Sequence, residues 1–169
     1  MTTIRAARED EYDKVGDLLA QAYAQYGPSS GDPPELLKAW GEYRAEIPDV
    51  RSRLHDSELI VAEVDGALLG AVTFYAPSKA NPDGWAPGYA AFRLLAVHPD
   101  ARGIGLGRAI TQWCIARATG TGARYLGLHT TPLMDVARAM YQRMGFERFP
   151  ENDHPITDEF IVEAYRLKL

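Results

Sequence analysis

The sequence lacks the features that mark disulfide-bonded, membrane-spanning and metal-binding proteins. It has one cysteine, Cys114, among 169 residues, which excludes an internal disulfide. This cysteine and the four histidines show no metal-ligand spacing such as Cys-x-x-Cys. No apolar run approaches the roughly 20 residues that cross a bilayer, and the first residues do not form a signal-peptide core. We therefore expect a cytoplasmic protein with no metal and no membrane partner.

An excess of positive charge is also missing. The 18 Lys and Arg residues against 23 Asp and Glu give a formal net charge of −5. This balance argues against nucleic acid as the main partner and favours a cationic one. Hydrophobic residues make up 46% of the chain, which has no low-complexity tract. We expect a single globular domain over residues 1–169.

The chain does contain a glycine-rich turn between a predicted strand and a predicted helix. Residues 89–97 are apolar, Pro99 breaks the pattern, and helical spacing begins at Leu106. The glycines of 103–107 therefore lie at a helix N-terminus, where free backbone N–H groups and the helix dipole attract phosphate. The dinucleotide fingerprint is excluded because its last glycine is replaced by Arg108, and no Gly-Lys-Ser/Thr of a triphosphate loop is present.

The remaining segments predict an α+β fold. Asp65-Gly66 indicates a two-residue hairpin between two apolar segments. Strands are expected at 3–6, 59–64, 67–75, 89–97, 125–129, 146–149 and 160–167, and helices at 15–23, 34–47, 106–118 and 136–144. This order predicts a mixed, mostly antiparallel twisted sheet of about seven strands, with about four helices on its faces.

Two motifs resemble the GNAT superfamily of N-acetyltransferases. Arg102-x-x-Gly105-x-Gly107, directly after Leu95-x-Val97-x-Pro99, is similar to the coenzyme A signature of that family. The segment 137–146, with Tyr141 and a terminal Gly-Phe, resembles its second motif. The resemblance implies the GNAT acyl-CoA N-acyltransferase fold, with acetyl-CoA as co-substrate. It further implies acetyl transfer to a primary amine by direct attack in a ternary complex, and a homodimer in many members.

The resemblance also assigns roles to residues. The backbone of Leu95, Ala96 and Val97 would pair with the pantetheine arm, and Tyr141 would donate a proton to the departing thiolate. The pyrophosphate would lie on the turn formed by Arg102, Gly103, Ile104, Gly105, Leu106, Gly107 and Arg108. Two alternatives stay open: Tyr141 as a core aromatic residue, and the two arginines as solvated surface charges.

The chain departs from the family pattern at two positions. Ala91 stands where many relatives carry a glutamate base, and Met134 stands where many carry an asparagine that contacts the coenzyme. An alkylammonium of pKa about 10.4 loses its proton at neutral pH at a cost of roughly 4 to 5 kcal/mol, so a base is needed. His129 is one candidate because its ordinary pKa is near neutral; Tyr89, Tyr75 and a water chain are others. The departures also allow an acyl-CoA-binding sensor or regulatory module that has lost catalysis.

Aromatic residues gather in the segments expected to face the coenzyme. Their rings offer packing and cation–π contacts to a small-molecule or peptide amine. Trp85, in a loop, is the strongest candidate for the acceptor pocket, together with Tyr89 and Tyr26. Trp40 and Tyr43 fit the buried face of the second helix, and core packing is the favoured interpretation for them. Cys114 lies on an apolar helix face, which indicates a packed thiol.

Overall fold

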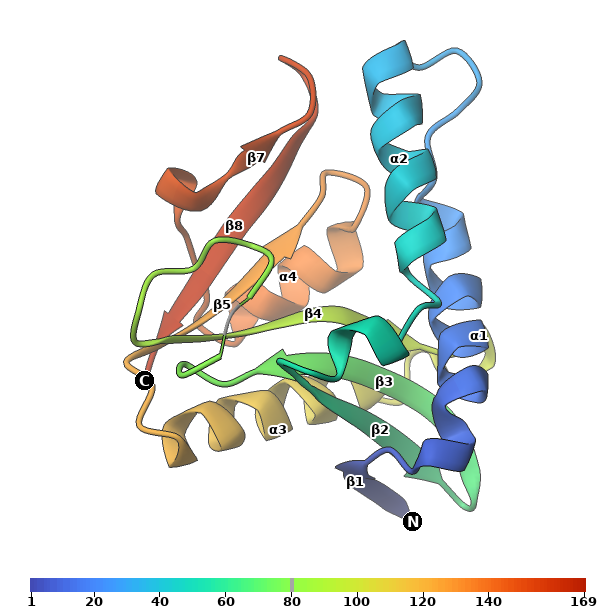
Figure 1. The fold of residues 1–169 in the computed structure, drawn as a ribbon, viewed down its shortest axis with the longest axis vertical. Coiled ribbons are helices and arrows are strands. Elements are labelled where there is room, and N and C mark those ends of the chain that lie inside the picture. Colours follow the sequence, from blue (N-terminus) through green and yellow to red (C-terminus); the bar gives the residue numbers. More distant parts are fainter. Residues whose placement is uncertain (80) are drawn as a thin grey trace.

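The computed structural model describes residues 1–79 and 81–169 and shows one central sheet (Figure 1). Its strand order is β1-β2-β3-β4-β5-β8-β6, with β7 paired to β8. The strands are β1 (Thr2–Ala6), β2 (Glu58–Val64), β3 (Ala67–Tyr75), β4 (Tyr89–Val97), β5 (Tyr125–Thr130), β6 (Glu147–Arg148), β7 (His154–Pro155) and β8 (Ile161–Lys168). The helices are α1 (Tyr12–Tyr23), α2 (Pro34–Glu46), α3 (Leu106–Gly120) and α4 (Asp135–Arg143). The predicted fold class is confirmed, with the two-residue β7 as the strand that the sequence pattern did not indicate.

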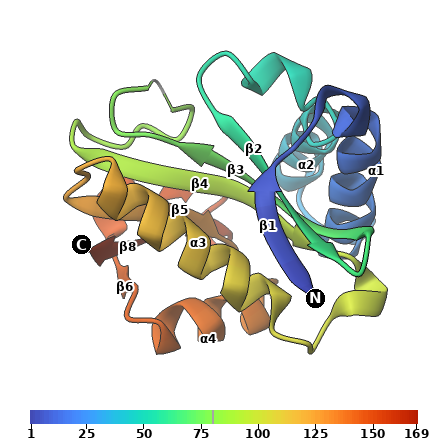
Figure 2. The same cartoon turned by 90° about the horizontal axis from the view of Figure 1, so that it is seen from below.

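Helices cover both faces of the sheet. Figure 2 shows α3 and α4 on one side of the strands and α1 and α2 on the other. Because side chains alternate along a strand, Ile60 and Phe74 pack toward α3, whereas Val61 and Ala71 pack toward α1. Burying a side chain as large as Phe74 contributes about 1.5–3 kcal/mol, so these two cores fix the helices on the sheet. No helix within the described residues is long and apolar enough to cross a membrane.

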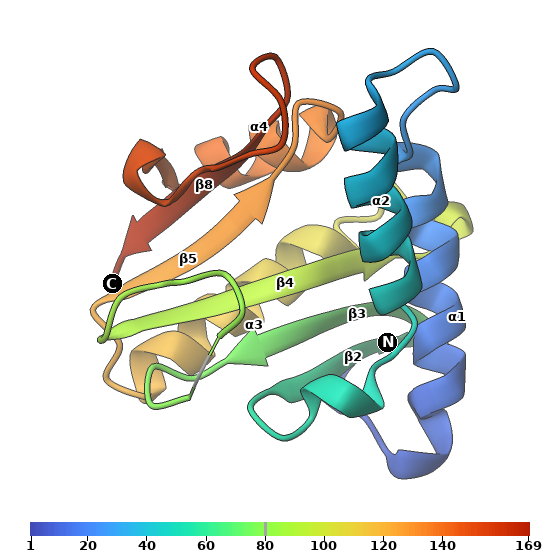
Figure 3. The same ribbon diagram turned by 45° about the horizontal axis from the view of Figure 1, so that its top comes forward.

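The sheet opens between β4 and β5. These two strands are the parallel pair of the sheet, and their pairing covers only Tyr89–Ala91 against Tyr125–Gly127. Beyond that point the strands diverge, as Figure 3 shows. Within the described part of the chain, the second half of β4 therefore has an edge toward β5 with no strand on it.

A bulge in β4 accompanies this opening. On β3 two steps separate Ala71 from Thr73, while on β4 three steps separate their partners Ala96 and Arg93. The extra residue is Leu94, whose φ of +54° is rare for a residue with a side chain and costs about 1 kcal/mol or more. The bulge bends β4 and redirects the segment that leads to the glycine turn.

Candidate active site

The glycine turn before α3 presents free backbone donors. Gly103 and Gly105 have φ values of +81° and +85°, which glycine adopts without the penalty of a Cβ atom. Among the described residues, the N–H groups of 103–108 donate to no protein acceptor. The turn is also exposed, with Ile104 at 62%. Because they lie at the positive end of the α3 dipole, these free N–H groups can bind an anion.

Two arginines flank the turn as predicted. Arg102 donates from Nη1 to the side-chain oxygen of Gln25 at 3.1 Å, so its charge is held in place by a neutral group and is not cancelled. Arg108 is exposed on the first turn of α3. Leu106 and Ala96 are each 3% exposed, so these two predicted contacts offer backbone atoms rather than side chains.

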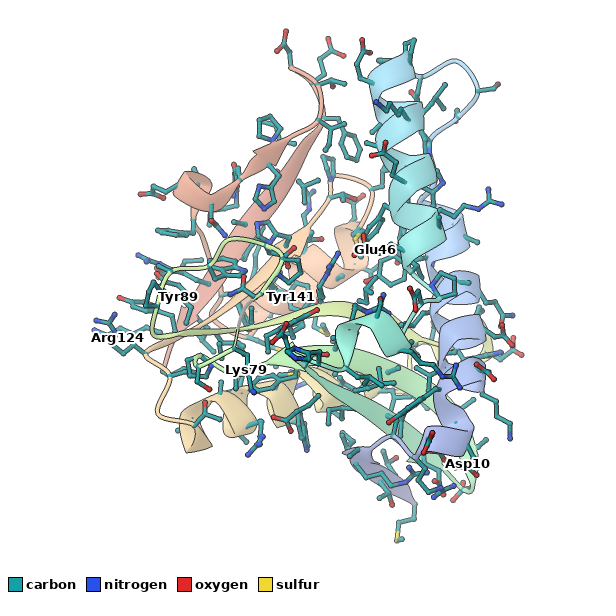
Figure 4. The ribbon with its side chains drawn as sticks, viewed as in Figure 1. Asp10, Glu46, Lys79, Tyr89, Arg124 and Tyr141 are labelled. Atoms are coloured by element: carbon teal, nitrogen blue, oxygen red, sulfur yellow. The ribbon has the colours of Figure 1, made fainter. Side chains whose placement is uncertain are left out.

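Tyr141, on α4, is 4% exposed and lies near the middle of the molecule (Figure 4). Its ring packs against Phe92 at 6.0 Å and Phe146 at 5.7 Å between centroids. Burial raises the pKa of its hydroxyl well above the ordinary value, and Cys114 and Tyr26 add to the rise. Tyr141 is thus a core residue and, at neutral pH, a neutral phenol that is able to donate a hydrogen bond.

His129, near the end of β5, has one ring nitrogen engaged and one free. Nε2 lies 2.8 Å from the carbonyl oxygen of Asn152. A carbonyl only accepts, so Nε2 carries the hydrogen and Nδ1 carries the lone pair. Nδ1 is buried and has no hydrogen-bond partner among the described residues. Desolvation lowers the pKa of His129 below its ordinary value, so the ring is neutral at neutral pH and Nδ1 is able to accept a proton.

A small group of charges surrounds His129. Asp83 places Oδ2 3.9 Å from Nδ1 of His129 and 4.0 Å from Nε of Arg93. Arg93 also contacts Glu46, with 3.3 Å between Nη1 and Oε1. Glu46 lies at the end of α2 (Figure 4). Arg93 was not predicted as a site residue from the sequence. The available signal is that Arg93 is the single charged residue of the otherwise apolar segment 89–97.

These groups face a cavity between α1 and α2 on one side and β5, β7 and β8 on the other. Its empty volume is about 1100 Å³, including the part open to solvent. Asp83, Arg93 and His129 line it, and so does the predicted pocket residue Tyr26. Its apolar walls include Leu36, Trp40, Tyr43, Ile156, Phe160 and Val162. Trp40 and Tyr43 therefore pack against the core and line the cavity at once.

Two predicted pocket residues, Trp85 and Tyr89, lie elsewhere. They are 6% and 8% exposed, stack at 5.3 Å, and are not part of the described cavity wall. The indole of Trp85 covers Gly127, where an added Cβ would approach to 2.4 Å. Ala91 is 1% exposed in the same cluster. The loop thus folds back onto β4 and β5 because the small residues Gly127 and Ala91 leave space in which the indole of Trp85 packs.

Cys114 is fully buried in the core beneath α3. Desolvation raises the pKa of its thiol far above the ordinary value, which disfavours the reactive thiolate. The prediction of a packed thiol is confirmed.

Comparisons with known proteins agree with this architecture. The family model described as Acetyltransferase (GNAT) family matches residues 15–146. A mycothiol acetyltransferase of Cellulomonas flavigena is 41% identical over 92 residues, which cover 53% of this chain and 26% of that protein. The aligned part thus spans about a quarter of that relative's length.

Solved structures share the fold over the whole chain. A GNAT-family acetyltransferase from Staphylococcus aureus Mu50 matches with a TM-score of 0.73, at 12% identity, over 100% of this chain and 99% of its own. A GNAT acetyltransferase from Brucella melitensis, solved in complex with acetyl-CoA, matches with a TM-score of 0.63, at 19% identity, over 100% of this chain and 88% of its own.

Proposed function

The chain belongs to the GNAT family of acetyltransferases, and we propose that it transfers the acetyl group of acetyl-CoA to a primary amine by direct attack in a ternary complex. One observation carries the proposal. The unpaired edge of β4 leads from the exposed donor turn of α3 toward the cavity that contains His129. A long ligand with an anionic end and a reactive end fits such a path.

The donor would lie along this edge. The turn at 103–108 offers N–H groups and the charges of Arg102 and Arg108 to a pyrophosphate. The backbone of Leu95–Val97 would pair with the pantetheine arm as an added strand. Gly107 supports this arrangement because an added Cβ there meets only ordinary contacts within the protein, the nearest atoms at 3.7 Å. Packing within the protein therefore does not require glycine at position 107, whereas close approach of a ligand to the backbone would require it.

An ammonium acceptor loses two protons in all, one before attack, so that its nitrogen has a lone pair, and one after the C–N bond forms; one of them reaches the thiolate and the other leaves to solvent. The nitrogen of the amine attacks the thioester carbonyl carbon, the C–N bond forms, and the C–S bond breaks. His129 would accept the ammonium proton at Nδ1, which carries a lone pair and has no partner among the described residues. This transfer precedes attack, because a protonated nitrogen has no lone pair. The second proton then leaves more easily, since formation of the C–N bond makes the nitrogen more acidic.

Tyr141 would serve the leaving group. Burial raises the pKa of its phenol, so it keeps its hydrogen and donates a hydrogen bond that strengthens as negative charge develops on sulfur. Complete proton transfer is less favourable than for a free tyrosine. The expected contribution is therefore stabilisation of the thiolate in the transition state.

The proposal is tested by incubating the protein with acetyl-CoA and a panel of primary amines. Thiol release and the mass of the acetylated amine are followed together. We expect equal amounts of both products, and we expect Tyr141→Phe to lower kcat by about 100-fold. Acetyl-CoA binding without thiol release from any amine would overturn the proposal. It would instead favour a coenzyme-binding sensor, to which Ala91 and Met134 would then point.

A further inference from the structure

The cavity wall contains two acceptors that lack a hydrogen-bond donor among the described residues, one buried on His129 and one partly buried on Asp83; the buried hydroxyl of Thr130 in the same wall also has no partner there. Nδ1 of His129, on a side chain 9% exposed, has no hydrogen-bond partner in the described part of the chain. The carboxylate of Asp83, on a side chain 16% exposed, accepts no hydrogen bond from the described residues. The two atoms are 3.9 Å apart, beyond hydrogen-bond distance of each other. A buried acceptor such as Nδ1 of His129 is normally satisfied, so its position beside the carboxylate of Asp83 points to a donor supplied from the cavity.

An ammonium group is the donor that fits both atoms. It carries three N–H groups and a positive charge, so one hydrogen can reach Asp83 while another reaches Nδ1 of His129. The carboxylate would hold the cation, and the imidazole would already be placed to receive its proton. A hydroxyl group has only one hydrogen and cannot satisfy both acceptors.

Within the described cavity wall, no further arginine, lysine or carboxylate is free to pair with a second charge on the same ligand. The guanidinium of Arg93 is 4.0 Å from Asp83 and 3.3 Å from Glu46, and it lies over the ring of Tyr43 at 5.9 Å. Two carboxylates therefore already engage it, and no other arginine or lysine is part of the described cavity wall. Asp83 is likewise the single carboxylate of that wall. A carboxylate or second ammonium on the ligand would lose its hydration without a partner.

Most of the remaining wall is aliphatic or aromatic, and Thr130, Thr131 and His154 are its other polar residues. Trp40 and Leu36 on α2 face Ile156, Phe160 and Val162 of the β7–β8 region across the cavity. We infer, on the basis of the proposed function, that the acceptor is an apolar primary monoamine. Its ammonium binds between Asp83 and His129, and its uncharged carbon body packs against this wall.

The test compares three amines at saturating acetyl-CoA. Phenethylamine has the proposed chemistry, phenylalanine adds a carboxylate, and 1,4-diaminobutane replaces the apolar body by a second ammonium. We expect kcat/KM for phenethylamine to exceed that of each of the others by about 100-fold. Asp83→Asn should raise the KM for phenethylamine by about ten- to a hundredfold and leave the KM for acetyl-CoA unchanged.

Two further variants distinguish a loss of acceptor binding from a loss of folding stability. Asp17→Asn removes an equal charge from the exposed face of α1 and should leave both KM values unchanged. Ala39→Glu places a carboxylate in the cavity wall on α2, and it should raise kcat/KM for 1,4-diaminobutane about tenfold over the wild type.

The outcomes separate the inference from the function on which it rests. Equal turnover of phenylalanine or 1,4-diaminobutane, or an unchanged KM in a folded Asp83→Asn variant, would overturn the inference and leave acetyl transfer standing. Thiol release from no amine at all would overturn the proposed function itself, and the acceptor class with it.

Discussion

Replacing His129 with glutamine removes the proposed base while keeping its structural hydrogen bond. The Nε2 of glutamine is able to donate to the carbonyl oxygen of Asn152, as the imidazole does at 2.8 Å. The lone pair of Nδ1, 3.9 Å from Asp83, has no counterpart in the new side chain. Loss of a positioned general base typically lowers the rate by about 10²- to 10⁴-fold, or about 3–5 kcal/mol in the barrier. We expect kcat of His129→Gln to fall within this range.

The pH dependence of kcat provides the sharper assay. His129 acts as a base only when neutral, so the rate falls as the pH drops through its pKa in the bound complex. Desolvation lowers that pKa, so the midpoint of this acidic limb should lie below the ordinary value of about 6.5. With amine and acetyl-CoA both saturating, the His129→Gln profile should lose this acidic limb.

Thermal unfolding supplies the control, because His129 also stacks on His154 at 4.5 Å. A folded His129→Gln variant whose kcat stays within threefold of the wild type, with the acidic limb intact, would refute the assignment. The base would then have to be sought among Tyr89, Tyr75 and water.

Three other predictions concern stability. Gly105→Ala should lower the free energy of unfolding, measured by chemical denaturation, by about 1–2 kcal/mol because φ at this position is +85°. Gly31→Ala, at a position with ordinary φ and open space, should change the free energy of unfolding by less than about 0.5 kcal/mol. Equal effects would contradict the backbone argument. Gly127→Ala should cost about 1–3 kcal/mol and alter tryptophan fluorescence, since its Cβ would meet Trp85 at 2.4 Å, and a neutral result would contradict the packing of the loop. A hydrogen bond from Arg5 lowers the pKa of Glu11 to about 2, so the stabilisation by this ion pair is complete above the unfolded pKa of about 4.3 and is lost as the pH falls toward 2. Glu11→Gln should therefore flatten the plot of unfolding free energy against pH in this window. An unchanged slope would count against the ion pair.

Local patterns predicted most of the fold. The strand at 89–97 was predicted with the bounds that the structure has, because an apolar run meets a proline break at its end. The hairpin at Asp65-Gly66 is also confirmed, with positive φ at both residues. The strand expected at 146–149 is reduced to Glu147–Arg148, since only these residues pair with β8. Leu94 shows the limit of such patterns, because its bulge depends on pairing with β3.

The site could be predicted only in part. The turn at 103–108 and Tyr141 belong to contiguous motifs, so the resemblance of these motifs to the GNAT family was enough to select them as candidates. Trp85 was placed in the pocket because nothing near it in sequence suggests a core; the residues that bury it come from β4, β5 and β8. The grouping of Asp83, Arg93 and His129 is likewise invisible in the sequence, because it depends on where the loop before β4 lies against β5.

A crystal structure with acetyl-CoA bound tests the central claim most directly. We predict that the pyrophosphate contacts the N–H groups of 103–108 and that the pantetheine arm pairs with Leu95–Val97. The sulfur should lie beside the hydroxyl of Tyr141, with the carbonyl carbon facing the cavity and His129. A pyrophosphate bound away from this turn, or a thioester outside the opening between β4 and β5, would contradict it.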